Sequence, residues 1–204
     1  MQASASAGTT VEFLFDFGSP NAYLCHKVIP SIEARTGARF AYVPILLGGL
    51  FKLASNRSPM EAFAAIPGKL AYERLEMERF IARHDLTCFR MNPHFPVNTL
   101  LAMRGMVAAQ RMRVEDAYVA AVLAGMWEDG EKMDDPEVFV RVLDAAGLDG
   151  RGILERTRDD GVKAELAANT EAVVARGAFG IPTFFVNGEM FFGKDRLAQV
   201  EEQL

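Results

Sequence analysis

The chain has 204 residues, half of them hydrophobic, which is enough to bury a sizeable core in one domain or in one domain with an insertion. It carries 22 Lys and Arg against 27 Asp and Glu, a net charge of −5, and the basic residues are interspersed with acidic ones, which argues against a nucleic-acid surface. No apolar run approaches the roughly 18 residues that span a bilayer, so no membrane contact is expected.

Residues 1–10 are rich in Ala, Ser, Gly and Thr and have neither a basic cluster nor an apolar run, so we expect a disordered tail and not a secretory signal. The two cysteines, Cys25 and Cys88, are too far apart in sequence for a CxxC pair, and the three histidines are dispersed as well. This spacing gives no support for a metal site, and a reducing cytosol is the expected compartment.

The first structured segment predicts a βαβ unit. Residues 11–17 are nearly all apolar, as in a strand that is buried on both faces. The tripeptide Gly-Ser-Pro at 18–20 predicts a helix start, because a Ser hydroxyl can cap free N–H groups and Pro tolerates the first helical position. We expect this helix to kink or restart at Pro30 and to end at Gly37. A second strand over residues 38–44 then implies a parallel strand pair.

The long central segment, residues 60–176, predicts helices only, since apolar residues recur there at helical spacing. Strand character returns at residues 183–192, where Asn-Gly joins two short apolar runs and predicts a hairpin with a type I′ turn. A short last helix is expected to open at Asp195. The predicted fold is therefore α/β, with residues 11–59 and 177–204 as one domain and residues 60–176 as an inserted helical domain.

Two motifs that could take part in chemistry lie on either side of this insert. Ser19 lies at a strand-to-helix junction, where the free N–H groups and the dipole of the helix stabilise an anion. Pro182 precedes a strand; a cis proline there would turn the backbone N–H and C=O of Ile181 outward, where an extended peptide could pair with them. Taken singly, each motif has an ordinary alternative: a helix cap for Ser19 and a strand start for Pro182.

A third motif lies at the start of the last helix. Helix N–H groups and Lys194 suit a carboxylate, while Asp195 suits an ammonium group. Together they suit the free α-amino-acid end of a γ-glutamyl group. Read alone, Asp195 is a helix cap and Arg196 a solvated charge.

These motifs, in this order, resemble those of the 2-hydroxychromene-2-carboxylate isomerases, relatives of the kappa-class glutathione transferases in the DsbA-like branch of the thioredoxin fold. The resemblance rests on residues 15–23 (Phe-Asp-Phe-Gly-Ser-Pro-Asn-Ala-Tyr), 95–99 (Phe-Pro-Val-Asn-Thr), 179–185 and 192–196. It extends from about Val11 to Leu204. It implies a thioredoxin-like fold with a large all-α insertion, glutathione as cofactor, and a homodimer.

By this resemblance, Ser19 matches the family's catalytic serine, which donates a hydrogen bond to the glutathione sulfur. The other implied cofactor contacts are Ile181 and Pro182 at the cysteinyl part, and Phe192, Gly193, Lys194 and Asp195 at the γ-glutamyl end. Lys52 and Asn56 resemble a loop that lines the cofactor and substrate cleft. Lys69 and Asn98 are further substrate candidates, although Asn98 also reads as a helix cap, and whether His94 faces the cleft stays open.

Redox relatives carry Cys-Pro-x-Cys where this chain has Ser-Pro-Asn-Ala at residues 19–22. Both thiols are missing, which excludes disulfide exchange by the usual route. Cys25 lies six positions beyond Ser19, or about 9 Å along a helix, and so cannot share the junction. It is expected to be a packed, inert thiol.

The resemblance favours a cis–trans isomerase that acts on 2-hydroxychromene-2-carboxylate or a similar aromatic acid, as in bacterial breakdown of naphthalene-like compounds. Reversible addition of the glutathione thiolate makes the double bond single and lets it rotate, with Ser19 holding the thiolate. Two alternatives stay open, because they use the same cofactor site: a kappa-like transferase that conjugates electrophiles, and a non-catalytic protein that binds glutathione or an aromatic acid.

Overall fold

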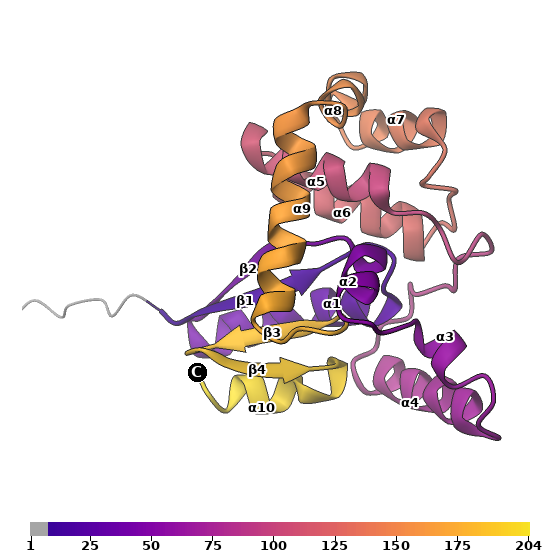
Figure 1. Cartoon of the computed structure of the whole chain (residues 1–204), viewed down its shortest axis with the longest axis vertical. Helices are drawn as coiled ribbons and strands as arrows, with labels where there is room; N and C mark the ends of the chain where they lie inside the picture. The colour runs from indigo at the N-terminus through magenta and orange to yellow at the C-terminus, as the bar shows by residue number, and fades with distance from the viewer. Residues whose placement is uncertain (1–7) are drawn as a thin grey trace, which may run out of the picture.

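In the computed structural model, which describes residues 8–204, four strands form one mixed sheet in the order β2-β1-β3-β4 (Figure 1). β1 (Thr10–Phe15) runs parallel to β2 (Arg39–Pro44) and antiparallel to β3 (Thr183–Val186), which turns back into β4 (Glu189–Phe192). The predicted parallel pair and hairpin are confirmed. Of the predicted tail, residues 1–7 lie outside the described part, and Thr10 already belongs to β1.

Helix α1 (Pro20–Thr36) begins and ends where the sequence predicts, with Ser19 as N-cap and Gly37 as C-cap at φ 72°. Of the expected kink or restart at Pro30, the restart is wrong, because α1 continues through this residue. Buried side chains on both sides of Pro30, among them Ile29 and Ile32, pack in the same hydrophobic core. This packing stabilises both halves of the helix.

Only helices connect β2 with β3 in the described structure, as predicted. Their bounds are α2 (Leu47–Leu53), α3 (Pro59–Ala62), α4 (Lys69–Arg83), α5 (Leu100–Met112), α6 (Glu115–Trp127), α7 (Pro136–Ala145), α8 (Gly150–Arg156) and α9 (Asp160–Ala175). Figure 1 shows α5 to α8 gathered above the sheet, whereas α3 and α4 project to one side. No helix within residues 8–204 is both long and apolar enough to cross a bilayer. The boundaries of the inserted domain stay a prediction.

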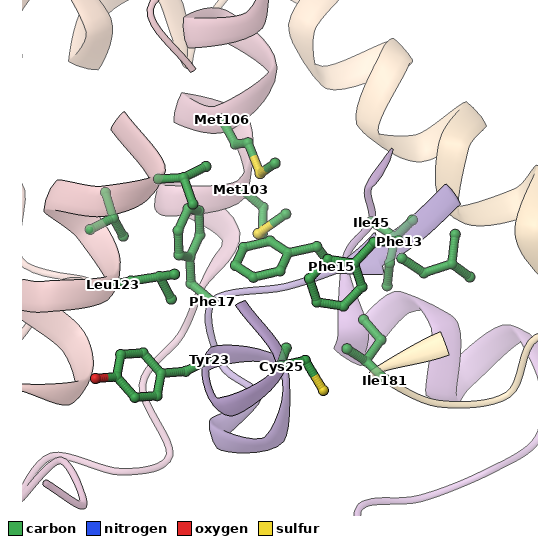
Figure 2. Close-up of a cluster of buried hydrophobic side chains, with 14 of the residues drawn as sticks. Phe13, Phe15, Phe17, Tyr23, Cys25, Ile45, Met103, Met106, Leu123 and Ile181 are labelled. Atoms are coloured by element: carbon green, nitrogen blue, oxygen red, sulfur yellow. The ribbon is translucent and has the colours of Figure 1, made fainter. Parts of the chain in front are cut away.

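The sheet and the helices share one hydrophobic core. Phe13, Leu14 and Phe15 of β1 are completely buried, and because successive side chains point to opposite faces, both faces of this strand are covered. Figure 2 shows Phe15 meeting Met103 of α5, with Phe17 reaching toward α6. This continuous core fixes the segment that follows β1 between the sheet and the helices.

The C-terminal segment differs from the expectation at one point. The hairpin turn has positive φ at both Asn187 (51°) and Gly188 (87°), as a type I′ turn requires. The helix predicted to open at Asp195 is instead a 3-10 turn, Lys194–Arg196, followed by α10 (Leu197–Glu201). The Asp195 side chain bonds to Lys194 and caps no backbone N–H, and this pairing displaces the helix start.

Candidate functional site

The three motifs predicted from the sequence meet at one edge of the sheet. Thr183 at the start of β3 pairs with Leu14 near the end of β1, so the residues after Phe15 and those before Thr183 lie at the same edge. The Ile181–Pro182 peptide bond is cis, as predicted. The Pro182 carbonyl accepts a hydrogen bond from Gly193 N–H at 2.8 Å, which brings the third motif to the same edge.

Ser19 begins α1 with its hydroxyl in a defined role. Its Oγ accepts the Ala22 N–H at 3.2 Å, so the hydroxyl hydrogen remains free to donate. The backbone N–H of Asn21 has no hydrogen-bond partner within residues 8–204, and Pro20 carries no N–H. The start of α1 therefore offers two donors and the positive end of a 17-residue helix to an anion.

The loop that carries Ser19 is held by contacts that the sequence analysis missed. The buried Asp16 carboxylate accepts N–H bonds from Gly18 (2.8 Å) and Leu47 (2.7 Å). The indole N–H of Trp127, at the end of α6, donates to the Phe17 carbonyl at 2.9 Å. The one available signal was Asp16 itself, a carboxylate between Phe15 and Phe17 at the end of a mostly apolar strand. These bonds fix the loop to α2 and α6.

The cis-proline segment, at the same edge of the sheet as this loop, carries unused backbone groups. Within the described structure, neither the N–H nor the C=O of Ile181 has a hydrogen-bond partner. Asn56, which the resemblance places in the substrate cleft, donates its side-chain amide to the Phe179 carbonyl at 2.8 Å. The Phe179 and Phe192 rings lie 4.7 Å apart and are 39% and 43% exposed. They form a partly open aromatic surface next to the unpaired backbone.

Lys194 and Asp195 form an ion pair with unequal exposure. Lys194 Nζ lies 2.8 Å from Asp195 Oδ1, with the two side chains 5% and 57% exposed. The ammonium group also lies 5.5 Å from the centre of the Phe80 ring of α4. The Asp195 carboxylate is thus accessible to a ligand, and its ion pair with the buried Lys194 restrains its position. A direct ligand contact by Lys194 stays a prediction.

Helix α2 connects the two sides of the site. Its first N–H, from Leu47, bonds to Asp16, and Asn56 just beyond the helix bonds to Phe179. Lys52 lies between these anchors, is exposed, and makes no ion pair within residues 8–204. Lys69 instead pairs with Glu73, one turn further along α4, so its predicted role in the cleft competes with an existing partner.

Asn98 makes the capping bond that its sequence context permits. Its Oδ1 accepts the Leu100 N–H at 3.0 Å, at the start of α5. It also borders a recess of about 280 Å³ together with Arg104 and Thr157. Neighbouring His94 is exposed, and its backbone N–H bonds to the Asn92 side chain. A role in substrate binding stays a prediction for Asn98, and the place of His94 in the cleft stays open.

Two other features contribute no chemistry at this edge. Cys25 is completely buried, and burial raises the pKa of its thiol, which agrees with the expected inert residue. A larger hollow of about 680 Å³ runs along the outer edge of β2 and includes His26 and Tyr42. Burial lowers the pKa of His26 to about 4, so its ring, bonded to the Tyr42 hydroxyl at 2.7 Å, is neutral near pH 7. None of the candidate residues lines this hollow, so it lies apart from the candidate site at Ser19.

The fold and this edge define a thioredoxin-type domain with serine in place of the redox cysteine. Residues 10–204 match the family of DSBA-like thioredoxin domains, and the chain belongs to that family.

Individual relatives and a solved structure show more specific similarities. The 2-hydroxychromene-2-carboxylate isomerase of Sphingobium xenophagum is 27% identical over 96% of this chain and 97% of its own length. Human glutathione S-transferase kappa 1 is 27% identical over 92% of this chain and 87% of its own. A solved structure of a 2-hydroxychromene-2-carboxylate isomerase superposes with a TM-score of 0.80 at 24% identity, covering 95% of this chain and 93% of that one. The resemblance inferred from the motifs and the thioredoxin-like fold with its helical insertion are confirmed.

Proposed function

We propose that this chain is a glutathione-dependent isomerase of 2-hydroxychromene-2-carboxylate or a similar aromatic acid. The observation that carries the proposal is the pair of unused donors at the start of α1, the Ser19 hydroxyl and the Asn21 N–H, opposite the unpaired backbone of Ile181. Isomerases of that name among the relatives support the reaction. The proposed setting is the cytosol.

The residues at this edge fit glutathione. The free N–H and C=O of Ile181 match the backbone of a short extended peptide, and the exposed Asp195 carboxylate matches the ammonium group of a γ-glutamyl end. When bound, glutathione supplies a thiol whose anion can add to a conjugated double bond and leave again, so that the bond can rotate in between.

The chain's own residues then have separate tasks. The Ser19 hydroxyl and the Asn21 N–H donate to the anionic sulfur and, with the helix dipole, lower the thiol pKa. Lys52, exposed and without an ion-pair partner among residues 8–204, suits the substrate carboxylate. The Phe179 and Phe192 rings suit a flat aromatic body.

The second candidate is a kappa-like transferase, favoured by the 27% identity to the human kappa enzyme. Both candidates use the same cofactor site. In the isomerase the sulfur–carbon bond breaks again and glutathione is regenerated. In the transferase the bond stays and the conjugate leaves the protein. A binding protein without catalysis would use the site and change neither ligand.

The test is an assay of the purified protein with a chromene carboxylate, with and without glutathione, followed by ultraviolet absorbance and proton NMR. We expect interconversion with the open-chain isomer only when glutathione is present, and no consumption of glutathione. Stoichiometric consumption, or turnover of a chloro-dinitrobenzene, would identify the transferase. Binding of both ligands without conversion would identify the binding protein.

A homodimer is part of the proposal. Met60, Ile66 and Tyr72, around α3 and α4, are large apolar side chains left more than half exposed in the single chain, at 58%, 51% and 52%. Apolar surface of this kind is typical of an interface. Sedimentation equilibrium should give twice the mass of the single chain; a monomer at all concentrations would contradict the dimer.

Asp195→Ala should weaken glutathione binding by at least about 1 kcal/mol, because it removes a charge-assisted hydrogen bond to the γ-glutamyl ammonium group. Isothermal titration calorimetry measures the change. Asp160→Ala is the matched control, since Asp160 is also exposed and also pairs with a lysine, Lys163, at 3.0 Å in α9. Equal affinity of the two variants would move the γ-glutamyl site elsewhere.

A further inference from the structure

The buried Asp16 carboxylate connects three segments around Ser19. Its Oδ1 accepts the Gly18 N–H at 2.8 Å in the loop before α1, and its Oδ2 accepts the Leu47 N–H at 2.7 Å, the first of α2. The Thr99 hydroxyl, at the start of α5, lies beside this carboxyl group and lowers its pKa. That hydroxyl makes no capping bond to α5, which leaves it free for Asp16.

The contact between α5 and the Ser19 loop is close. A Cβ atom placed on Gly18 would lie 3.1 Å from Thr99 Cγ2 and 3.3 Å from Asp16 Oδ1. The peptide before Ser19 therefore lies directly against Thr99 and Asp16, with no room for a side chain. Any movement of Thr99 or of the Asp16 carboxyl is transmitted to the backbone that carries Ser19.

The carboxylate has no other support. Asp16 is completely buried and pairs with no basic side chain within residues 8–204. Burial raises its pKa, and the N–H bonds from Gly18 and Leu47 together with the Thr99 hydroxyl offset only part of that rise. Because a buried carboxylate without donors is strongly unfavourable, the two N–H bonds and the neighbouring Thr99 hydroxyl resist displacement, and so do the segments that supply them.

We propose that Asp16 and Thr99 are positioning residues that set the direction of the Ser19 hydroxyl relative to α2, which carries Lys52, and to the start of α5. They touch neither cofactor nor substrate in this assignment; glutathione is held at Ile181 and Asp195. This inference rests on the proposed function. It predicts that damage to the Asp16–Thr99 contact lowers kcat and leaves glutathione affinity and KM nearly unchanged.

Thr99→Val keeps the shape of the side chain and removes the donor, and we expect kcat to fall about tenfold, the scale of one lost hydrogen bond to a charged group. Thr99→Ser keeps the hydroxyl and should restore most of kcat. Thr170→Val is the matched control: its buried hydroxyl accepts the N–H of Leu46, next to Leu47, but does not contact the Ser19 loop. It should turn over like the wild type.

Asp16→Asn tests the other partner and should lower kcat further, since its NH₂ group then opposes one of the N–H donors. Backbone amide hydrogen exchange at Gly18 and Leu47 gives a readout without any ligand, and it should be faster in this variant. Exchange at the wild-type rate overturns the inference, and so does equal kcat in Thr99→Val and Thr170→Val. If the wild type does not isomerise, the proposed function fails. Amide hydrogen exchange at Gly18 in Asp16→Asn, faster than in the wild type or not, then decides the positioning role. If Asp16→Asn does not fold, exchange and kcat in the Thr99 variants decide.

Discussion

Ser19→Ala should slow turnover near pH 7 by about ten- to a hundred-fold and leave the fold and most of the glutathione affinity intact. The hydroxyl hydrogen of Ser19 is free while its Oγ accepts the Ala22 N–H, so it can donate to a thiolate in the cofactor site. Without it, the pKa of bound glutathione rises, and less of the cofactor is ionised near neutral pH. Asn21 N–H and the helix dipole remain and keep the loss within this range.

The pH dependence of turnover in Ser19→Ala shows whether the lost activity comes from a raised thiol pKa. Because the variant lacks thiolate and not thiol, part of its lost activity should return as pH rises and the thiol ionises unaided. Loss of the cap also destabilises α1 by about 1 kcal/mol, which urea unfolding measures separately. Ser58→Ala is the control, since Ser58 caps α3 by accepting the Glu61 N–H at 3.3 Å and lies outside the proposed site. If Ser19→Ala and Ser58→Ala both match the wild type in turnover at every pH, Ser19 is only a helix cap.

Ser19→Cys complements this test. A thiol at the start of α1 should weaken isomerisation and, when glutathione disulfide is added, form a mixed disulfide with release of one glutathione. It should not support dithiol exchange, because Ala22 leaves no resolving thiol at the fourth position of the motif.

Local rules account for the features that the sequence predicts well. The cap at Ser19 involves an N–H only three residues away, and the hairpin turn at Asn187 and Gly188 follows from their tolerance of positive φ. The fold class follows from the order of such elements, because a strand, a helix and a strand close together permit few arrangements.

The supports of the site depend on distant residues, which no short pattern contains. The hydrogen bond between Trp127 and Phe17 joins residues 110 positions apart in the chain, and the one between Leu47 and Asp16 joins residues 31 positions apart. The start of the last helix shows the same limit. Its local pattern favours a cap at Asp195, but the Asp195 carboxylate pairs with the neighbouring Lys194, whose side chain is buried beside Phe80 of the distant α4.

Gly105→Ala should lower the free energy of unfolding by about 2 kcal/mol, although alanine favours a helix over glycine by up to about 1 kcal/mol. Gly105 lies in α5 where α6 crosses it: an added Cβ would lie 2.2 Å from the Tyr118 hydroxyl oxygen and 3.0 Å from Phe139 Cζ. Tyr118 is completely buried, and its hydroxyl donates to the Ala102 carbonyl at 2.7 Å, so the ring cannot swing away. The added methyl group therefore pushes α5 away from α6.

Gly48→Ala is the control of opposite sign, because Gly48 lies in α2 with no atom within 4 Å of the added Cβ, so alanine should stabilise there. Urea unfolding of both variants measures the difference. Adding Tyr118→Phe to Gly105→Ala removes the closest oxygen, so the double variant should lose less stability than the sum of the two single changes. Since α5 starts at the Thr99 contact, displacing it should also lower kcat in Gly105→Ala, and Tyr118→Phe should recover part of that loss. A Gly105→Ala protein as stable as the wild type would contradict the close crossing of α5 and α6 on which the position of Thr99 depends.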